Sequence, residues 1–256
     1  MTAVAVRPTS LIPVPRSPGD ANPLQAVEAS PASPAGRAVA YQRVLHRLVR
    51  RELRLLGELA AWAPADETQR ITALTRHAEL IGRVLLHHHD VERHAVWPAL
   101  LGATPVDRAD EVRTAVQDWT TRCARIDHMV RDVATAARQW DVAATGPARN
   151  AFALASQGLS DAVDAQTADE ERTLLPLLGE HLQDPDWTAI ARSSPCQLSG
   201  REQLLVLGLA LEDSCAADRA RLLDGLSPSA RTAWRLYGRR SYRAAVVRLR
   251  GAPPAS

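Results

Sequence analysis

The segment 85–98 contains polar side chains that could bind a metal ion within an otherwise apolar helical pattern. On a helix, residues four apart lie on one face with their Cβ atoms roughly 5–6 Å apart, close enough to share a cation. His88 and Glu92 have this spacing and fall on the apolar stripe of the segment. Imidazole and carboxylate groups suit divalent iron, manganese and zinc. The pair predicts a metal site if other helices supply further ligands.

Three further histidines of this segment lie off the stripe. His87, His89 and His94 project to the sides of the helix. We therefore expect them to be solvated, or to support the ligands from behind. An isolated His and Glu pair is more often incidental than a site, so the hypothesis depends on matching residues elsewhere in the chain.

Two other helical stripes each place one metal-capable residue at an inward position. In residues 37–62, positions at alternating steps of three and four form a stripe that contains His46. In residues 107–140, the stripe has Cys123 at its centre, whereas His128 lies off it. A lone histidine or cysteine on such a stripe is more often a core residue than a ligand, so both interpretations stay open.

The helical pattern at residues 148–181 repeats the spacing of the first pair. Gln166 and Glu170 are four residues apart on its stripe. In addition, a proline follows both Glu92 and Glu170 after six residues. This match indicates equivalent positions on two helices of one bundle.

The composition favours helices over sheet. The 256 residues include one Phe and three Tyr, and the 17 prolines and 13 glycines concentrate at the ends and between long segments rich in Ala, Leu, Arg and Glu. Residues 66–101 also have an amphipathic helical pattern, like residues 37–62, 107–140 and 148–181. Four such patterns predict an all-α, up-down-up-down four-helix bundle. We expect a disordered Pro-rich leader at 1–36, the bundle at 37–183, a linker at 184–198 and a C-terminal helical extension at 199–251.

Charge and hydropathy narrow the functional classes. The net charge of +2 gives no reason to expect a nucleic-acid partner for the whole chain. No apolar run is long enough to span a membrane, and no signal peptide is recognisable. The three cysteines are scattered and form no disulfide framework. We therefore expect a cytoplasmic protein. Residues 227–256 contain seven arginines and no acid. We interpret these as solvated or docked on the bundle, with contact to an acidic partner, a nucleic acid or an anionic membrane as the alternative.

Several of these segments resemble the hemerythrin-like (HHE cation-binding) domain family. The resemblance covers about residues 38–251. The C-terminal part, with Leu211-Glu212-Asp213 and residues 234–240, is similar to an extension found on actinobacterial members. In the bundle, the resemblance rests on Leu45-His46-Arg47, on His88-His89-Asp90-Val91-Glu92 before Trp97-Pro98, and on Glu170-Glu171 before Leu174-Leu175-Pro176.

The family holds two iron ions inside its bundle. One His comes from helix one, a His-x-x-x-Glu pair from helix two, one His from helix three and a second such pair from helix four. Cys123 and Gln166 stand where the helix-three and helix-four histidines are expected, so this half-site should bind metal weakly or not at all, because a thiol in apolar surroundings has a raised pKa and an amide is neutral. The ligands that the resemblance implies for the retained half-site are His46, His88, Glu92 and Glu170.

The resemblance implies a non-haem iron protein that binds or senses oxygen, nitric oxide or peroxide. It would hold one iron ion, or two, and manganese or zinc suit the same ligands. Two other hypotheses stay open: a metal-free helical scaffold or interaction protein with a decayed site, and an enzyme that turns over peroxide or dioxygen at a single iron. The chain contains no phosphate-binding loop, dinucleotide-binding glycine motif or catalytic triad pattern.

Overall fold

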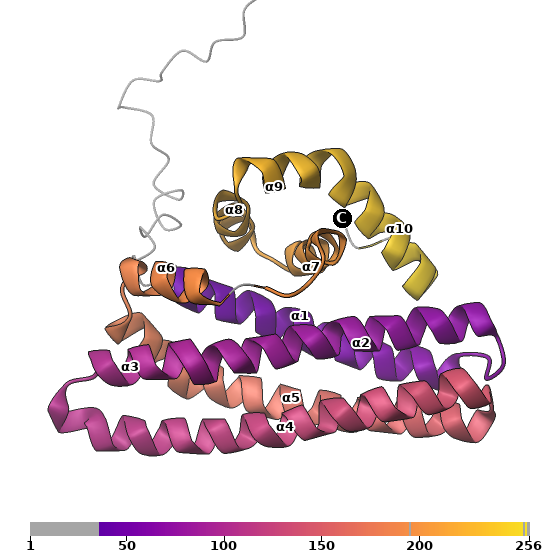
Figure 1. The fold of residues 1–256 in the computed structure, drawn as a ribbon, viewed down its shortest axis with the longest axis horizontal. Helices are drawn as coiled ribbons and strands as arrows, with labels where there is room; N and C mark the ends of the chain where they lie inside the picture. The colour runs from indigo at the N-terminus through magenta and orange to yellow at the C-terminus, as the bar shows by residue number, and fades with distance from the viewer. Residues whose placement is uncertain (1–35, 195, 253, 255–256) are drawn as a thin grey trace, which may run out of the picture. The chain divides into compact units, whose positions relative to one another are not determined.

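The computed structural model describes residues 36–194, 196–252 and 254, and these residues contain helices and no strand. The long bundle helices run alternately up and down (Figure 1). This confirms the predicted all-α bundle, while the expected disordered leader, apart from Gly36, lies outside the described residues. The bundle consists of α1 (Gly36–Trp62), α2 (Thr68–Val91) continued by η1 (Glu92–Val96) and α3 (Trp97–Ala103), the short turn η2 (Val106–Arg108), α4 (Ala109–Ala143) and α5 (Gly146–His181).

The second bundle helix is continuous but changes its winding at the predicted metal-binding segment. Because Pro98 lacks a backbone N–H, it cannot donate to the carbonyl of His94. The chain forms the π-helical turn η1, closed by a hydrogen bond from the Trp97 N–H to the Glu92 carbonyl. Such turns inside α-helices are frequent at functional sites, and this one begins at Glu92.

The remaining helices lie on the outer side of α1 and α2, with α9 farther from the bundle than α7 (Figure 1). Contacts join α7 and α8 to α1, and α10 to α2. Ser199 and Glu202 form the capping box at the start of α7, as their spacing indicates. In the described part of the chain, no helix is both long and apolar enough to cross a membrane. The C-terminal elements are α7 (Gly200–Glu212), α8 (Ala216–Asp224), α9 (Pro228–Ala233), η3 (Trp234–Gly238) and α10 (Arg239–Arg250).

Residues 184–198, predicted as a linker, contain a helix that the sequence pattern does not indicate. This helix, α6 (Asp184–Ser193), has Pro185 in its first turn and a capping box between Gln183 and Asp186. Proline is tolerated in a first turn because the N–H groups there have no partner within the helix. Pro185 therefore marks the start of a helix and not a break, while the domain boundaries themselves stay a prediction.

A layer of polar side chains separates two apolar clusters in the bundle core. One cluster contains Trp140 and Phe152, and the other contains Trp97 and Trp119. Buried polar groups are unfavourable unless they are hydrogen-bonded, paired or coordinated, so the layer needs a compensating interaction. Its buried members are Gln42, His46, His88, Glu92, Cys123, Gln166 and Glu170.

A buried ionic network joins α10 to the bundle. Glu52 is fully buried, and its carboxylate lies 2.9 Å from His77 Nε2, 2.6 Å from Arg51 Nε and 2.7 Å from an Arg250 nitrogen. Arg250 also contacts Glu212 at 2.7 Å. Burial raises the pKa of Glu52, but the contact with His77 and the charges of Arg51 and Arg250 together lower it to about 2.

One C-terminal arginine contacts buried carboxylates, whereas most of the others are exposed to solvent. Arg250 binds bundle and extension carboxylates, whereas the five arginines at 235, 239, 240, 243 and 248 are exposed. One of these arginines is therefore docked on the protein and others are solvated, as we interpret from the sequence. Contact with an acidic partner stays a proposal.

We predict that Arg250→Met destabilises the protein by about 2 kcal/mol, because the buried Glu52 carboxylate loses one arginine but keeps its contacts with Arg51 and His77. Arg248→Met is the matched control: its side chain is exposed, and the stability should change by less than about 0.5 kcal/mol. Urea unfolding followed by circular dichroism measures both variants. Equal stability of the two would contradict a stabilising role for the network.

The lowered pKa of Glu52 also predicts a pH dependence. Since its pKa falls from 4.5 to about 2 on folding, the stabilisation is fully present above about pH 4.5 and is lost as the pH falls toward 2. Glu52→Gln removes this titration and should show a smaller loss of stability over that window. Unfolding measured between about pH 5 and pH 3 tests this, and parallel profiles for the two proteins would refute it.

Candidate metal centre

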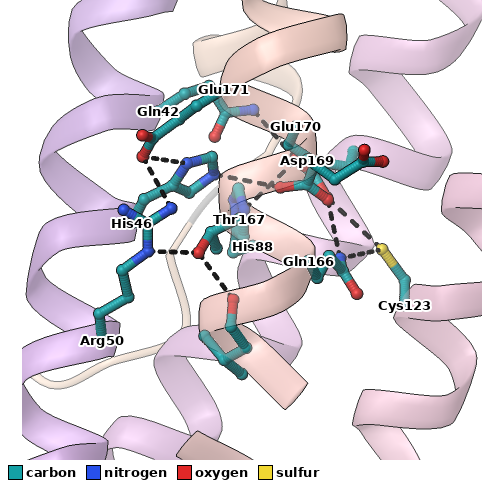
Figure 2. A network of polar contacts seen from close by, with 12 residues as sticks. Gln42, His46, Arg50, His88, Cys123, Gln166, Thr167, Asp169, Glu170 and Glu171 are labelled. Carbon is teal, nitrogen blue, oxygen red and sulfur yellow. Dashed lines mark hydrogen bonds and ion pairs between the residues drawn. The ribbon is translucent and has the colours of Figure 1, made fainter. Parts of the chain in front are cut away.

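His46 is completely buried on α1 and faces a carboxylate of α5 (Figure 2). Its Nε2 lies 3.2 Å from Glu170 Oε2, and neither atom has a hydrogen-bond partner among the described residues. Its Nδ1 lies 3.2 Å from Glu171 Oε1, which Arg50 also contacts at 3.1 Å. The imidazole is thus held on its outer side, while its inner nitrogen faces a buried, unsatisfied oxygen.

His88 and Glu92 bring the second helix into the same cluster. As their spacing predicts, the side chains meet, with 3.3 Å between His88 Nε2 and Glu92 Oε1. Gln42 Nε2 donates to the same Glu92 oxygen at 3.1 Å. One ligand atom each from His46, His88 and Glu170 lie within 4.8 Å of one another, and all three residues are buried. This separation is small enough for one cation to draw the three groups together.

Without a cation, burial disfavours the charged forms of Glu92 and His88. Burial raises the pKa of Glu92 well above its usual value, and the nearby Glu170 raises it further. Burial, with the neighbouring histidines, lowers the pKa of His88 well below its usual value. Burial also acts against charge on His46, but the carboxylates of Glu170 and Glu171 outweigh it and raise its pKa. A divalent cation would stabilise the carboxylates and accept the imidazole lone pairs, so these residues fit a metal ion.

Cys123 and Gln166 lie in the same polar layer (Figure 2). Gln166 Nε2 donates to Cys123 Sγ at 3.2 Å and to Glu170 Oε1 at 2.7 Å. The Cys123 thiol donates to Glu92 Oε2 at 3.7 Å. Burial, together with the nearby carboxylates, raises the pKa of Cys123. The structure thus brings all six predicted site residues together, and the thiol is buried as expected.

His89 is buried beside the site, which excludes one of the two positions that we expect for it, solvated or behind the ligands. It is buried, so it is not solvated, whereas His94 is exposed and His87 is partly exposed. Its Nδ1 lies 2.5 Å from Asp127 Oδ1, and Arg93 donates to the other Asp127 oxygen at 2.7 Å. A single stripe is too narrow a guide here, because a bundle helix contacts neighbours on two sides and buries a wider face.

Other contributors were recognisable only in part. Glu171 belongs to the family-like segment, but its contact with the outer nitrogen of His46 depends on how α1 and α5 pack. Gln42 lies on the inward stripe of α1, four residues before His46, and that position is the signal that could have identified it.

A buried group of histidines and carboxylates inside four antiparallel helices defines a metal-binding helical bundle. The family model that matches the chain is described as the hemerythrin HHE cation binding domain, and it covers residues 37–178. Because the match spans more than half of the sequence, the chain belongs to the hemerythrin HHE cation-binding family. No curated protein and no solved structure matched in the other two comparisons.

We predict that Glu171→Gln weakens divalent-cation binding about 10-fold to 100-fold, because the outer nitrogen of His46 loses its carboxylate partner. Glu180→Gln, in the exposed last turn of α5, is the matched control and should bind like the unsubstituted protein. Calorimetric titration of metal-free protein with ferrous iron or manganese measures both affinities. An unchanged affinity in Glu171→Gln would show that this contact does not serve a metal ligand.

Proposed function

We propose that the bundle binds a non-haem iron ion through His46, His88, Glu92 and Glu170 and uses it to bind or sense a small ligand such as oxygen, nitric oxide or peroxide. The observation that carries this proposal is the approach of His46 Nε2 to Glu170 Oε2 at 3.2 Å, with neither atom hydrogen-bonded in the described part of the chain. Two such atoms in a core are unfavourable unless a proton or a cation lies between them, and a cation would satisfy both. Membership of a cation-binding family supports this assignment.

The protein groups have separate roles in this proposal. The imidazoles of His46 and His88 donate lone pairs, and the carboxylates of Glu92 and Glu170 balance the charge of the ion. Glu171 fixes the ring of His46, and Gln42 orients Glu92. A bound iron supplies a coordination position for a small ligand. The apolar clusters on both sides of the layer limit access of water.

A cavity lies next to two of the helices that carry the proposed ligands. Its volume is about 880 Å³, and it lies between α1, α2 and the C-terminal helices. Leu45 and His87, the sequence neighbours of two proposed ligands, line it together with apolar residues of α7. Its lining also includes the charged residues Arg83, Asp90, Arg93, Asp127 and Arg131. The cavity therefore has mixed polarity and does not by itself select an uncharged ligand.

The replaced histidines favour one iron over two. Cys123 and Gln166 occupy the positions of two family histidines, and the Gln166 amide donates to Cys123 and Glu170. Reversible oxygen carriage by the family depends on two irons sharing electrons, so the substitutions argue against that activity. The three free cysteines support a reducing, cytoplasmic setting as part of the same proposal.

We predict about one iron per chain after reconstitution with ferrous iron. His46→Ala and His88→Ala should each abolish stoichiometric binding, because each removes an imidazole from the cluster. His128→Ala is the matched control, since its side chain is 71% exposed. Elemental analysis of purified protein gives the ratio directly.

The same samples separate the rival functions. Protein that binds no metal would support the scaffold hypothesis and overturn the proposal. Two irons per chain with an oxo-bridge absorption band would overturn the single-iron claim. Peroxide consumption by iron-loaded protein that is lost in His46→Ala and kept in His128→Ala would favour the enzyme. Nitric oxide binding without turnover, followed by absorption, would favour the sensor.

A further inference from the structure

We propose that the bundle also binds a second divalent cation at a site that contains a thiolate, formed by Cys123, His89 and Glu92, and that this site favours an ion of the zinc class. The proposal deepens the proposed function, because Glu92 belongs to both sites. Cys123 takes the place of the family's helix-three histidine, whereas His89 matches no ligand of the family pattern. With His89 as an added ligand, the proposal revises our expectation that this half-site binds metal weakly or not at all.

The three groups form a compact, buried set of ligands. One ring nitrogen of His89, one Glu92 oxygen and Cys123 Sγ lie within 4.8 Å of one another. The relative exposure of these residues is 2%, 0% and 0%. Ligand atoms around a tetrahedral zinc ion lie roughly 3.5 Å apart, given bond lengths of about 2.0–2.3 Å, so small side-chain movements close the site. The Gln166 amide, whose nitrogen lies 3.2 Å from Cys123 Sγ, offers its oxygen as a fourth ligand, since Oε1 is buried without a hydrogen-bond partner in the described residues.

His89 is supported in the same way as His46. Its Nδ1 meets the Asp127 carboxylate, which Arg93 anchors from the far side. The ring of His46 is likewise followed by a carboxylate and then by an arginine. Metal-binding histidines almost always donate their second ring N–H to such a partner, which leaves the lone pair on the other nitrogen. The repeat of this arrangement on a second helix pair supports a ligand role for His89.

Cys123 has polar neighbours that a packing residue does not need. Gln166 donates to its sulfur at 3.2 Å, and the thiol lies 3.7 Å from Glu92 Oε2. When a zinc-class ion binds, the S–H bond breaks, a sulfur–metal bond forms and the proton passes to solvent. No oxidant or reductant is involved in this step.

The ligand types predict different metals at the two positions. A thiolate, an imidazole and a carboxylate prefer zinc or cobalt over magnesium, calcium or manganese. Two imidazoles with two carboxylates suit iron or manganese. Because Glu92 is shared, an ion at one position changes the charge at the other.

The test uses Co²⁺ as the probe, since it replaces zinc and absorbs in the near ultraviolet when sulfur coordinates it. Cys196→Ser and Cys215→Ser together leave Cys123 as the single thiol, and a serine hydroxyl can replace the Cys215 sulfur that caps α8. In this background we expect the sulfur-to-cobalt band to saturate with about one thiolate-bound Co²⁺ per chain. Adding Cys123→Ser should remove the band and lower the cobalt content by about one ion per chain.

Two further variants keep the test decisive if Cys123→Ser disturbs folding. Asp127→Asn leaves every proposed ligand in place. It should lower the affinity for the Co²⁺ ion that gives the sulfur-to-cobalt band about 10-fold to 100-fold, because His89 loses its charged partner. His94→Ala, which changes an exposed histidine, should leave the band unchanged. Cobalt binding without a sulfur band in the single-thiol protein would overturn the proposal.

The two proposals fail separately. His46→Ala should abolish iron binding but retain the sulfur-to-cobalt band, because His46 does not belong to the thiolate set. A band in protein that binds no iron would leave this inference standing and refute the proposed function. Iron binding in protein without the sulfur-to-cobalt band would support the proposed function and refute this inference.

Discussion

The structure depends on a polar layer buried between two apolar clusters of one helical bundle. Glu170 lies close enough to Glu92 to raise its pKa, and the imidazoles beside them keep nitrogen atoms facing carboxylate oxygens. Burying such groups in an apolar interior is unfavourable unless protons or a cation neutralise them. Metal binding would therefore contribute directly to folding stability, since the cation is bound only when the four helices meet.

The surrounding structure holds this layer in position from outside. Carboxylates contact the outer nitrogens of His46 and His89, and arginines anchor those carboxylates in turn. The π-helical turn η1 begins at Glu92 and is followed by Pro98, which has no backbone N–H to donate to the carbonyl of His94. The C-terminal helices cover α1 and α2, and the network around the buried Glu52 ties α10 to them. Contacts remote from the centre thus limit the movement of the helices that carry three of the four proposed iron ligands.

Much of the architecture follows from hydrophobic periodicity. The stripes predict the four bundle helices closely, and they place His46, His88, Cys123, Gln166 and Glu170 inward because one face of each helix must be buried. Periodicity along one helix cannot report which neighbour a side chain meets. His89 contacts Asp127 across 38 residues, and Glu52 meets Arg250 across 198, so neither pair is visible locally. Helix α6 was missed for a different reason, because Pro185 is compatible with both a break and a first helical turn.

The most direct measurement of the central claim is anomalous X-ray scattering from crystals of iron-loaded protein, with data collected on both sides of the iron absorption edge. The account predicts an iron peak within about 2.0–2.3 Å of His46 Nε2, a His88 ring nitrogen and an oxygen of Glu170, typical of metal–ligand bonds in proteins. An iron peak elsewhere, or none in the polar layer of crystals shown to contain iron, would contradict it.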